Sequence, residues 1–95
     1  MDKFPLVVKK EYTMYLEFFD HVYWFHVDVH EWSPKVKRMM LKDLRKIQDL
    51  VTIPLRALAS SENLKLIKFG ECLGWRFELE TTLKDGSKAV IYKWS

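Results

Sequence analysis

Apolar and polar residues alternate along the first third of the chain, which is the pattern of half-buried β-strands. The clearest case is the segment 22–30. One face there carries Tyr23, Phe25, Val27 and Val29, and the other carries Trp24, His26, Asp28 and His30. We therefore expect strands at Leu6–Val8, Tyr12–Phe19 and Val22–His30, with a tight turn at Asp20 and His21 between the last two.

The spacing then changes to the three- and four-residue period of a helix. Ser33 followed by Pro34 is a strong helix start, because serine caps the first turn and proline fits its first position. The helix should run from about Pro34 to Leu50. Its apolar stripe is formed by Val36, Met40, Leu44, Ile47 and Val51.

A strand is expected next, at Thr52–Leu58, although it contains Pro54. A second helix should begin at Ser60 and Ser61 and end before Gly74, because glycine is common just after a helix.

The chain should end in a hairpin made of strands Trp75–Leu83 and Ala89–Trp94. The turn Lys84–Ser87 contains Asp-Gly, which suits the backbone of tight hairpins. The first of these strands should place on one face Phe77, Leu79, Thr81 and Leu83. The predicted order is β-β-β-α-β-α-β-β. This order predicts a single α+β domain over residues 1–95, with one mixed sheet of about six strands and two helices.

Composition narrows the class of protein. The single cysteine, Cys72, excludes an internal disulfide and a multi-cysteine zinc site, and we expect it to lie in the core. No stretch approaches the roughly 20 apolar residues of a membrane span, and residues 1–10 do not read as a signal peptide. We therefore expect no membrane contact and a cytoplasmic-type setting. The net charge of +3 permits contact with anions without requiring it.

The segment Asn63–Trp75 carries a recognisable motif. An Asn is followed by apolar residues three and six positions on, and then by Glu-x-Leu-Gly-aromatic. The matching residues are Asn63, Leu66, Phe69, Glu71, Leu73, Gly74 and Trp75. This motif resembles the fourth helix of the GNAT family of N-acetyltransferases. The resemblance implies a truncated GNAT-like fold without the first two family helices. It also implies a cleft for acetyl-CoA where the strands before and after the first helix splay apart.

Two departures from the family pattern weigh against acetyl transfer. Family members hold the pyrophosphate of acetyl-CoA in a glycine-rich loop, where bare backbone N–H groups approach the phosphates. Here the loop reads Glu31-Trp-Ser-Pro-Lys-Val36 and has no glycine. Gly70 stands where the family commonly has the tyrosine thought to protonate the departing thiolate, and glycine donates no proton. The economical interpretation is a GNAT-like domain that uses no cofactor and acts by binding.

The partner would be a protein or a second copy of the chain, because loss of two helices should leave apolar sheet surface uncovered. We expect the contact surface to include Trp32, Lys35, Arg38 and Lys42. The Trp-containing turn and the basic helix after it also resemble small GNAT-like proteins of short-tailed phages. That resemblance implies a structural role in a virion.

Two other functions stay open. In a divergent acetyltransferase, acetyl-CoA would be held by Ser33, Lys35, Lys37, Arg38 and Asn63. In a nucleic-acid binder, the basic helix would contact phosphates without reading sequence. Its six cations are expected to spread over much of the polar surface, and they are Lys35, Lys37, Arg38, Lys42, Arg45 and Lys46.

One constellation resembles a metal site. The side chains of His26, Asp28 and His30 share a strand face, and two His with one Asp could hold zinc. The favoured interpretation has no metal, since no second ligand cluster is present: the residues form an ordinary polar strand face, or the histidines are hydrogen-bonded under a helix. No residue stands out as a catalytic base or nucleophile.

Overall fold

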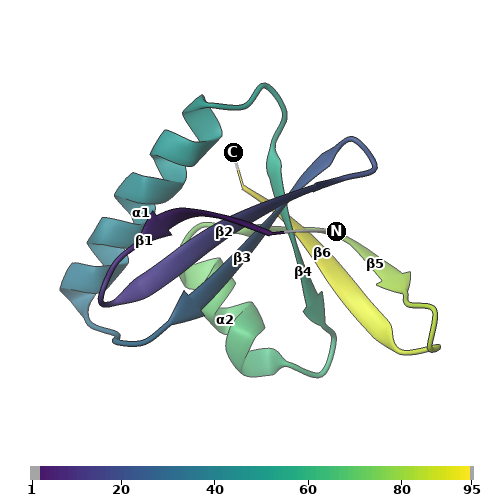
Figure 1. Ribbon diagram of the computed structural model, residues 1–95. Helices are drawn as coiled ribbons and strands as arrows, with labels where there is room; N and C mark the ends of the chain where they lie inside the picture. Colours follow the sequence, from purple (N-terminus) through teal and green to yellow (C-terminus); the bar gives the residue numbers. More distant parts are fainter. Residues whose placement is uncertain (1–2, 95) are drawn as a thin grey trace.

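The computed structural model describes residues 3–94, and it shows an α+β arrangement of six strands in one mixed sheet with two helices (Figure 1). The elements in chain order are β1 Phe4–Val8, β2 Tyr12–Phe19, β3 Val22–Val29, α1 Pro34–Asp49, β4 Leu55–Ser60, α2 Leu64–Cys72, β5 Arg76–Thr82 and β6 Lys88–Trp94. The strands lie in the order β1-β2-β3-β4-β6-β5. This confirms the fold and the element order expected from the sequence.

Helix α1 supplies most of the helical part of the core. Its apolar stripe is buried as predicted, at Val36, Met40, Leu44 and Ile47. This stripe packs against strand residues whose side chains point the same way, such as Met14, Phe25 and Leu55. Burial of apolar surface of this kind is the main term that stabilises a domain of this size.

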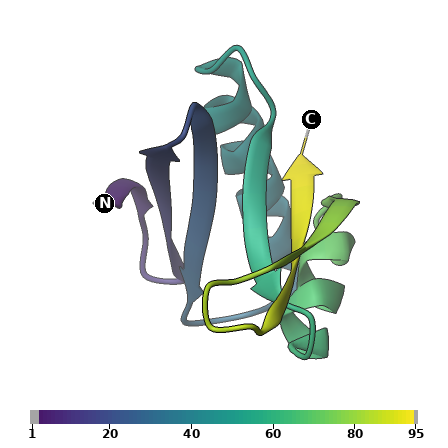
Figure 2. The same cartoon turned by 90° about the vertical axis from the view of Figure 1, so that its right-hand side faces the viewer.

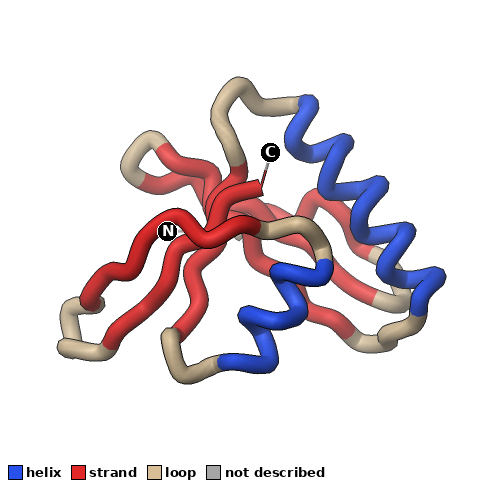
Figure 3. Tube along the Cα trace, turned by 180° about the vertical axis from the view of Figure 1, so that it is seen from behind, coloured by secondary structure: helices blue, strands red, loops and turns tan. Residues whose placement is uncertain are grey.

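Both helices cover the same face of the sheet. Ile67 and Phe69 of α2 pack against the same core cluster as α1, and the view from behind shows both helices on the near side of the strands (Figure 3). The opposite face of the sheet carries no helix within residues 3–94, as the side view also shows (Figure 2). We call it the helix-free face. Tyr15, Trp24 and Leu58 lie on it.

The largest differences from the predicted element boundaries are at β4 and α2. The strand expected at Thr52–Leu58 runs instead from Leu55 to Ser60. The side chain of Gln48 explains the delay. It donates to the Ile53 carbonyl at 2.9 Å and accepts from the Leu55 N–H at 3.0 Å, so it holds the preceding segment as a connection.

The second helix begins later than expected. Ser60 is still paired with Ala89 in the sheet, so the two serines do not start α2. Asn63 caps the helix instead, and its Oδ1 accepts a hydrogen bond from the Leu66 N–H at 3.2 Å. Gly74, with φ of 94°, follows the helix as predicted.

Strand β5 departs from simple alternation. A bulge between Phe77 and Leu79 shifts its pairing with β6, so that Phe77 lies opposite Tyr92 and Leu79 lies opposite Ile91. Because a bulge moves the following residues to the other face, the prediction that Phe77 and Leu79 share a face is wrong. Both side chains are exposed.

Within residues 3–94, neither helix is long and apolar enough to cross a membrane.

Candidate functional site

The two parallel strands at the centre of the sheet, β3 and β4, separate soon after they meet. Their register contains the single pair Trp24↔Arg56 in the described part of the chain, whereas β2 and β3 are aligned from Tyr12↔Val29 to Phe19↔Val22. Beyond the pair the strands diverge toward their C-terminal ends. The resemblance predicted a cleft at this place, and the structure has an opening there.

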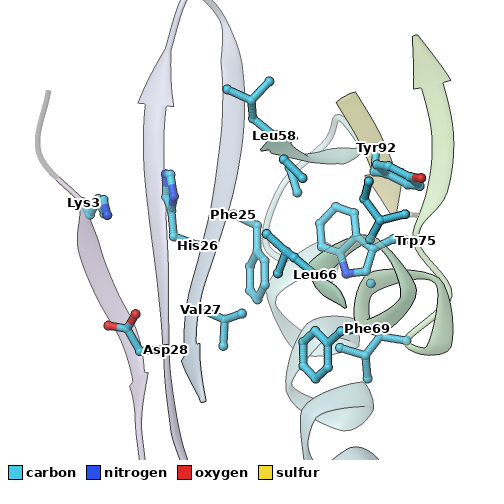
Figure 4. Close-up of a pocket in the computed structure, with 15 residues that line it drawn as sticks. Lys3, Phe25, His26, Val27, Asp28, Leu58, Leu66, Phe69, Trp75 and Tyr92 are labelled. Atoms are coloured by element: carbon cyan, nitrogen blue, oxygen red, sulfur yellow. The ribbon is translucent and has the colours of Figure 1, made fainter. Parts of the chain in front are cut away.

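A cavity of about 220 Å³ lies in the opening between the two strands (Figure 4). Its throat is apolar. Phe25 and Val27 enter from β3, Leu66 and Phe69 enter from α2, and Trp75 closes one end. The rings of Phe25 and Trp75 have their centroids 5.4 Å apart. Such a lining suits an apolar group and excludes water from it.

The mouth of the cavity on the helix-free face is polar. Lys3, His26 and Asp28 line it (Figure 4). His26 Nε2 lies 3.0 Å from the Glu17 carboxylate, and the Tyr15 hydroxyl donates to Asp28 at 3.0 Å. That hydrogen bond raises the pKa of Tyr15. A ligand that enters from this face would meet charged groups first and apolar walls afterwards.

His26 and Asp28 therefore have separate partners across the strands. Across residues 3–94 no three metal-ligating side chains gather in one place. These residues lie on a polar strand face, and the absence of a metal there stays a prediction.

Gly70 of α2 forms part of the cavity wall with backbone alone. A Cβ placed there would meet the Trp75 side chain at 3.7 Å, which is ordinary contact. Gly70 therefore brings no hydroxyl to the cavity at the position where the family resemblance expects a tyrosine.

The first turn of α1 shows how few backbone donors remain for an anion. Pro34 has no N–H. The Val36 N–H donates to Ser33 Oγ at 3.2 Å, and the Lys37 N–H donates to the Ser33 carbonyl at 3.0 Å. Of the N–H groups in this turn, only that of Lys35 is left to meet a ligand.

The cationic residues predicted to hold acetyl-CoA do not line the cavity. Lys35 is exposed. Lys37 lines a hollow between α1 and the end of α2. Arg38 lines the outer surface of α1, together with Lys42, which was predicted only to contact a partner. Asn63 is nearer to the opening, as the cap of α2. Their binding roles stay predictions.

A broader groove lies beside the cavity, between the end of β3 and α2. Trp32 and Phe69 form its aromatic floor, with ring centroids 5.0 Å apart and an interplanar angle of 66°. Lys65 and Lys68 line it. The sequence analysis did not single out these two lysines. Both follow the Asn63 cap within α2, three residues apart, and this spacing was the available signal.

For two side chains near this groove, the exposure predicted from the sequence can be compared with the structure. Trp32 was expected to be exposed, and it is 48% exposed. Cys72 was expected to lie in the core, and this is wrong, because its side chain is exposed and lines the groove. Cys72 is the last residue of α2.

One comparison with a solved structure supports the fold. A solved structure from Bordetella pertussis, described as a GnaT-family acetyltransferase, matches 90% of this chain with a TM-score of 0.66 and 17% identity. A protein from Sphaerobacter thermophilus, assigned as an acetyltransferase, matches 87% of the chain with a TM-score of 0.48 and 10% identity. No family model matches the sequence, and no curated protein does.

The chain spans less than two thirds of these solved structures, 57% of the first and 59% of the second. The match to the Bordetella pertussis structure shows the fold, and at 17% identity it shows no finer property. The fold is GNAT-like.

Proposed function

We propose that this chain is a GNAT-like domain that works by binding a protein and does not transfer acetyl groups. The observation that carries the proposal is the state of the first turn of α1. A diphosphate needs several backbone N–H groups directed at it. Here Pro34 supplies none, and Ser33 Oγ already accepts the N–H of Val36.

The cavity wall supports the same conclusion. Gly70 carries no acid that could protonate a thiolate leaving group. A water would have to perform that step, in a throat lined mainly by Phe25, Phe69 and Trp75. The apolar throat is better suited to hold an apolar side chain of a partner.

The helix-free face offers the partner a surface next to the cavity mouth. Leu58 and Leu79 lie on this face and are 45% and 44% exposed. Exposed apolar groups of this size on a sheet are often covered by another chain. The link to phage virion proteins stays a prediction, because it rests on the sequence resemblance alone.

Isothermal calorimetry with acetyl-CoA and with free CoA tests the proposal. We expect no saturable heat at micromolar protein. The variant Ser33→Gly with Pro34→Gly restores two backbone N–H groups to the turn, and it should bind CoA more tightly than the natural chain. Saturable micromolar binding of acetyl-CoA to the natural chain would overturn the proposal.

A divergent acetyltransferase is the second candidate, and one observation favours it. Lys65 and Lys68 line the groove beside Asn63 and the aromatic floor. These side chains could hold phosphates in place of the missing backbone N–H groups, although the cations first suspected, Lys35, Lys37 and Arg38, do not line the groove or the cavity.

Acetylation of a panel of amines, followed by release of free CoA thiol, separates the two candidates. The second candidate requires turnover that Asn63→Ala or Lys65→Glu with Lys68→Glu abolishes. Lys84→Glu with Lys88→Glu is the matched control, because it makes the same change in net charge on the β5–β6 hairpin. Absence of turnover in the natural chain removes this candidate.

A further inference from the structure

The positive charge of the protein is concentrated on one helix. Six basic residues and two aspartates give α1 a charge of +4. Since the whole chain carries +3, the remaining residues together carry −1. The outer surface of α1 is therefore the basic surface of an otherwise nearly neutral domain.

Five of the six cations of α1 lie on one side of it. At 100° per residue they fall within an arc of about 100°, opposite the buried apolar stripe. We call this set the basic stripe, and its members are Lys35, Arg38, Lys42, Arg45 and Lys46. All five are exposed, and four of them line a single hollow along the helix. The sequence analysis expected the six cations to spread over the polar surface. This is wrong, because only Lys37 lies outside the basic stripe.

Acidic side chains neutralise only part of the basic stripe, through Asp43, which interacts with Lys46, and through Asp49. Asp43 belongs to the buried side of α1, where it accepts hydrogen bonds from Tyr12 and from Lys9. Asp49 is the one acid that shares the hollow with the stripe, and it lies at the end of the helix. Among residues 3–94, the ion pairs of the protein lie on other elements or on the buried side of α1.

We propose that the basic stripe binds the sugar-phosphate backbone of a double-stranded nucleic acid, independently of base sequence. A row of exposed cations in which positive charge predominates matches a row of phosphates. The stripe has no exposed aromatic side chain of the kind that single-strand binders use to stack bases. It also lacks the apolar or aromatic anchors that carry most protein interfaces, since Leu41 in the hollow is half-buried.

The length of the stripe limits the number of contacts. From Lys35 to Lys46 the helix advances about 16 Å, at 1.5 Å per residue. That length allows about four phosphate contacts. Four contacts predict a slope near −3.6 for the logarithm of the binding constant against the logarithm of salt concentration, so affinity should fall about 100-fold between 50 and 200 mM salt.

Fluorescence anisotropy with a labelled 20-base-pair DNA duplex, and with an RNA duplex of the same sequence, measures this slope. The test variant is Lys42→Glu with Arg45→Glu. We expect it to weaken binding at 50 mM salt by at least about tenfold and to reduce the slope by about 2. A second DNA duplex of unrelated sequence should bind with equal affinity.

The matched control is Lys84→Glu with Lys88→Glu, which changes net charge equally. These residues belong to the β5–β6 hairpin, on the other side of the molecule from α1 (Figure 1). The control should retain affinity within about twofold of the natural chain. Equal loss in both double variants would overturn the proposal, because it would show dependence on net charge alone.

Two other results would also overturn it. One is binding of the natural chain to poly-glutamate as tightly as to either duplex, which would identify an acidic protein as the partner. The other is binding that does not change between 50 and 200 mM salt. If the double variant does not fold, Lys42→Gln with Arg45→Gln provides the test, and Lys84→Gln with Lys88→Gln is then the control with equal change in net charge. The result is separate from the proposed function, because neither variant alters the cavity and acetyl-CoA is absent from the assay.

Discussion

The Tyr12 hydroxyl donates a hydrogen bond to the Asp43 carboxylate, and so joins β2 to the middle of α1. Lys9 donates to the same carboxylate oxygen at 2.8 Å from the turn between β1 and β2. Asp43 is the one buried charged residue among residues 3–94. A buried carboxylate is stable when it is paired and hydrogen-bonded in this way.

The first prediction concerns acid stability. Burial acts to raise the pKa of Asp43, but the hydrogen bonds from Lys9 and Tyr12 and the charges of Lys9 and Lys46 hold it below its ordinary value. A lowered folded-state pKa stabilises the protein above the unfolded value, and that contribution is lost as the pH falls through the folded value. The free energy of unfolding should therefore fall as the pH drops below about 4.

The variant Asp43→Asn tests this origin. At pH 7 it should lower the free energy of unfolding by about 1–3 kcal/mol, and it should reduce the fall at low pH. Urea unfolding between pH 2.5 and 7 gives both quantities. Asp49→Asn, on the exposed side of the same helix, should change neither. If the free energy of unfolding of Asp43→Asn falls at low pH as much as that of the natural chain, the fall comes from other carboxylates.

The second prediction contrasts two glycines four residues apart. Gly74 adopts φ of 94°, and a Cβ there would lie 3.4 Å from Trp94 Nε1, so Gly74→Ala should destabilise the protein by about 1 kcal/mol or more. Gly70 is inside α2 with room for a methyl group, so Gly70→Ala should stabilise it by about 0.5–1 kcal/mol. Opposite shifts of the thermal midpoint are expected, and shifts of one sign would contradict the account.

The third prediction concerns an ion pair that crosses the sheet. Arg56 of β4 contacts the Glu78 carboxylate of β5 through two nitrogens, at 2.8 and 3.2 Å, over the intervening β6. The hydrogen bond from Arg56 lowers the pKa of Glu78. A double-mutant cycle should give a coupling of about 0.5–1 kcal/mol. The looser, more exposed pair of Lys88 and Glu80 at 3.7 Å is the comparison, and it should couple close to zero.

The fourth prediction concerns Cys72. Because its side chain is exposed, the thiol should react with a disulfide reagent in the folded protein at a rate within about tenfold of the denatured rate. Absorbance of the released chromophore measures both rates. Reaction only after denaturation would show that the Cys72 thiol is buried in the folded protein. Since Cys72 lines the groove beside the cavity, a label on it would also report occupancy of that groove.

Local signals in the sequence were sufficient for α1. The Ser33 cap, the proline after it and the apolar stripe are all contained in adjacent turns of one helix, so they need no knowledge of the rest of the fold. The Asp-Gly turn of the final hairpin is similar, because Gly86 adopts φ of 87° and the Asp85 carboxylate accepts from the Ser87 N–H.

The sequence did not reveal features that depend on distant contacts. The delayed start of β4 depends on the Gln48 side chain, and the late start of α2 depends on pairing of Ser60 with Ala89. The bulge at Phe77 is set by pairing with β6. The cavity itself depends on which strands separate. The place of Lys65 and Lys68 in the same groove as Trp32 depends on where α2 packs.

The pair Trp24↔Arg56 is the one point of register between β3 and β4 in residues 3–94. In mechanical terms, the sheet is two three-stranded halves, and their relative rotation is opposed mainly by side chains and by the helices across them. A molecule seated in the opening would touch both halves and restrain that rotation. Its arrival would therefore slow hydrogen exchange in strands that it never contacts.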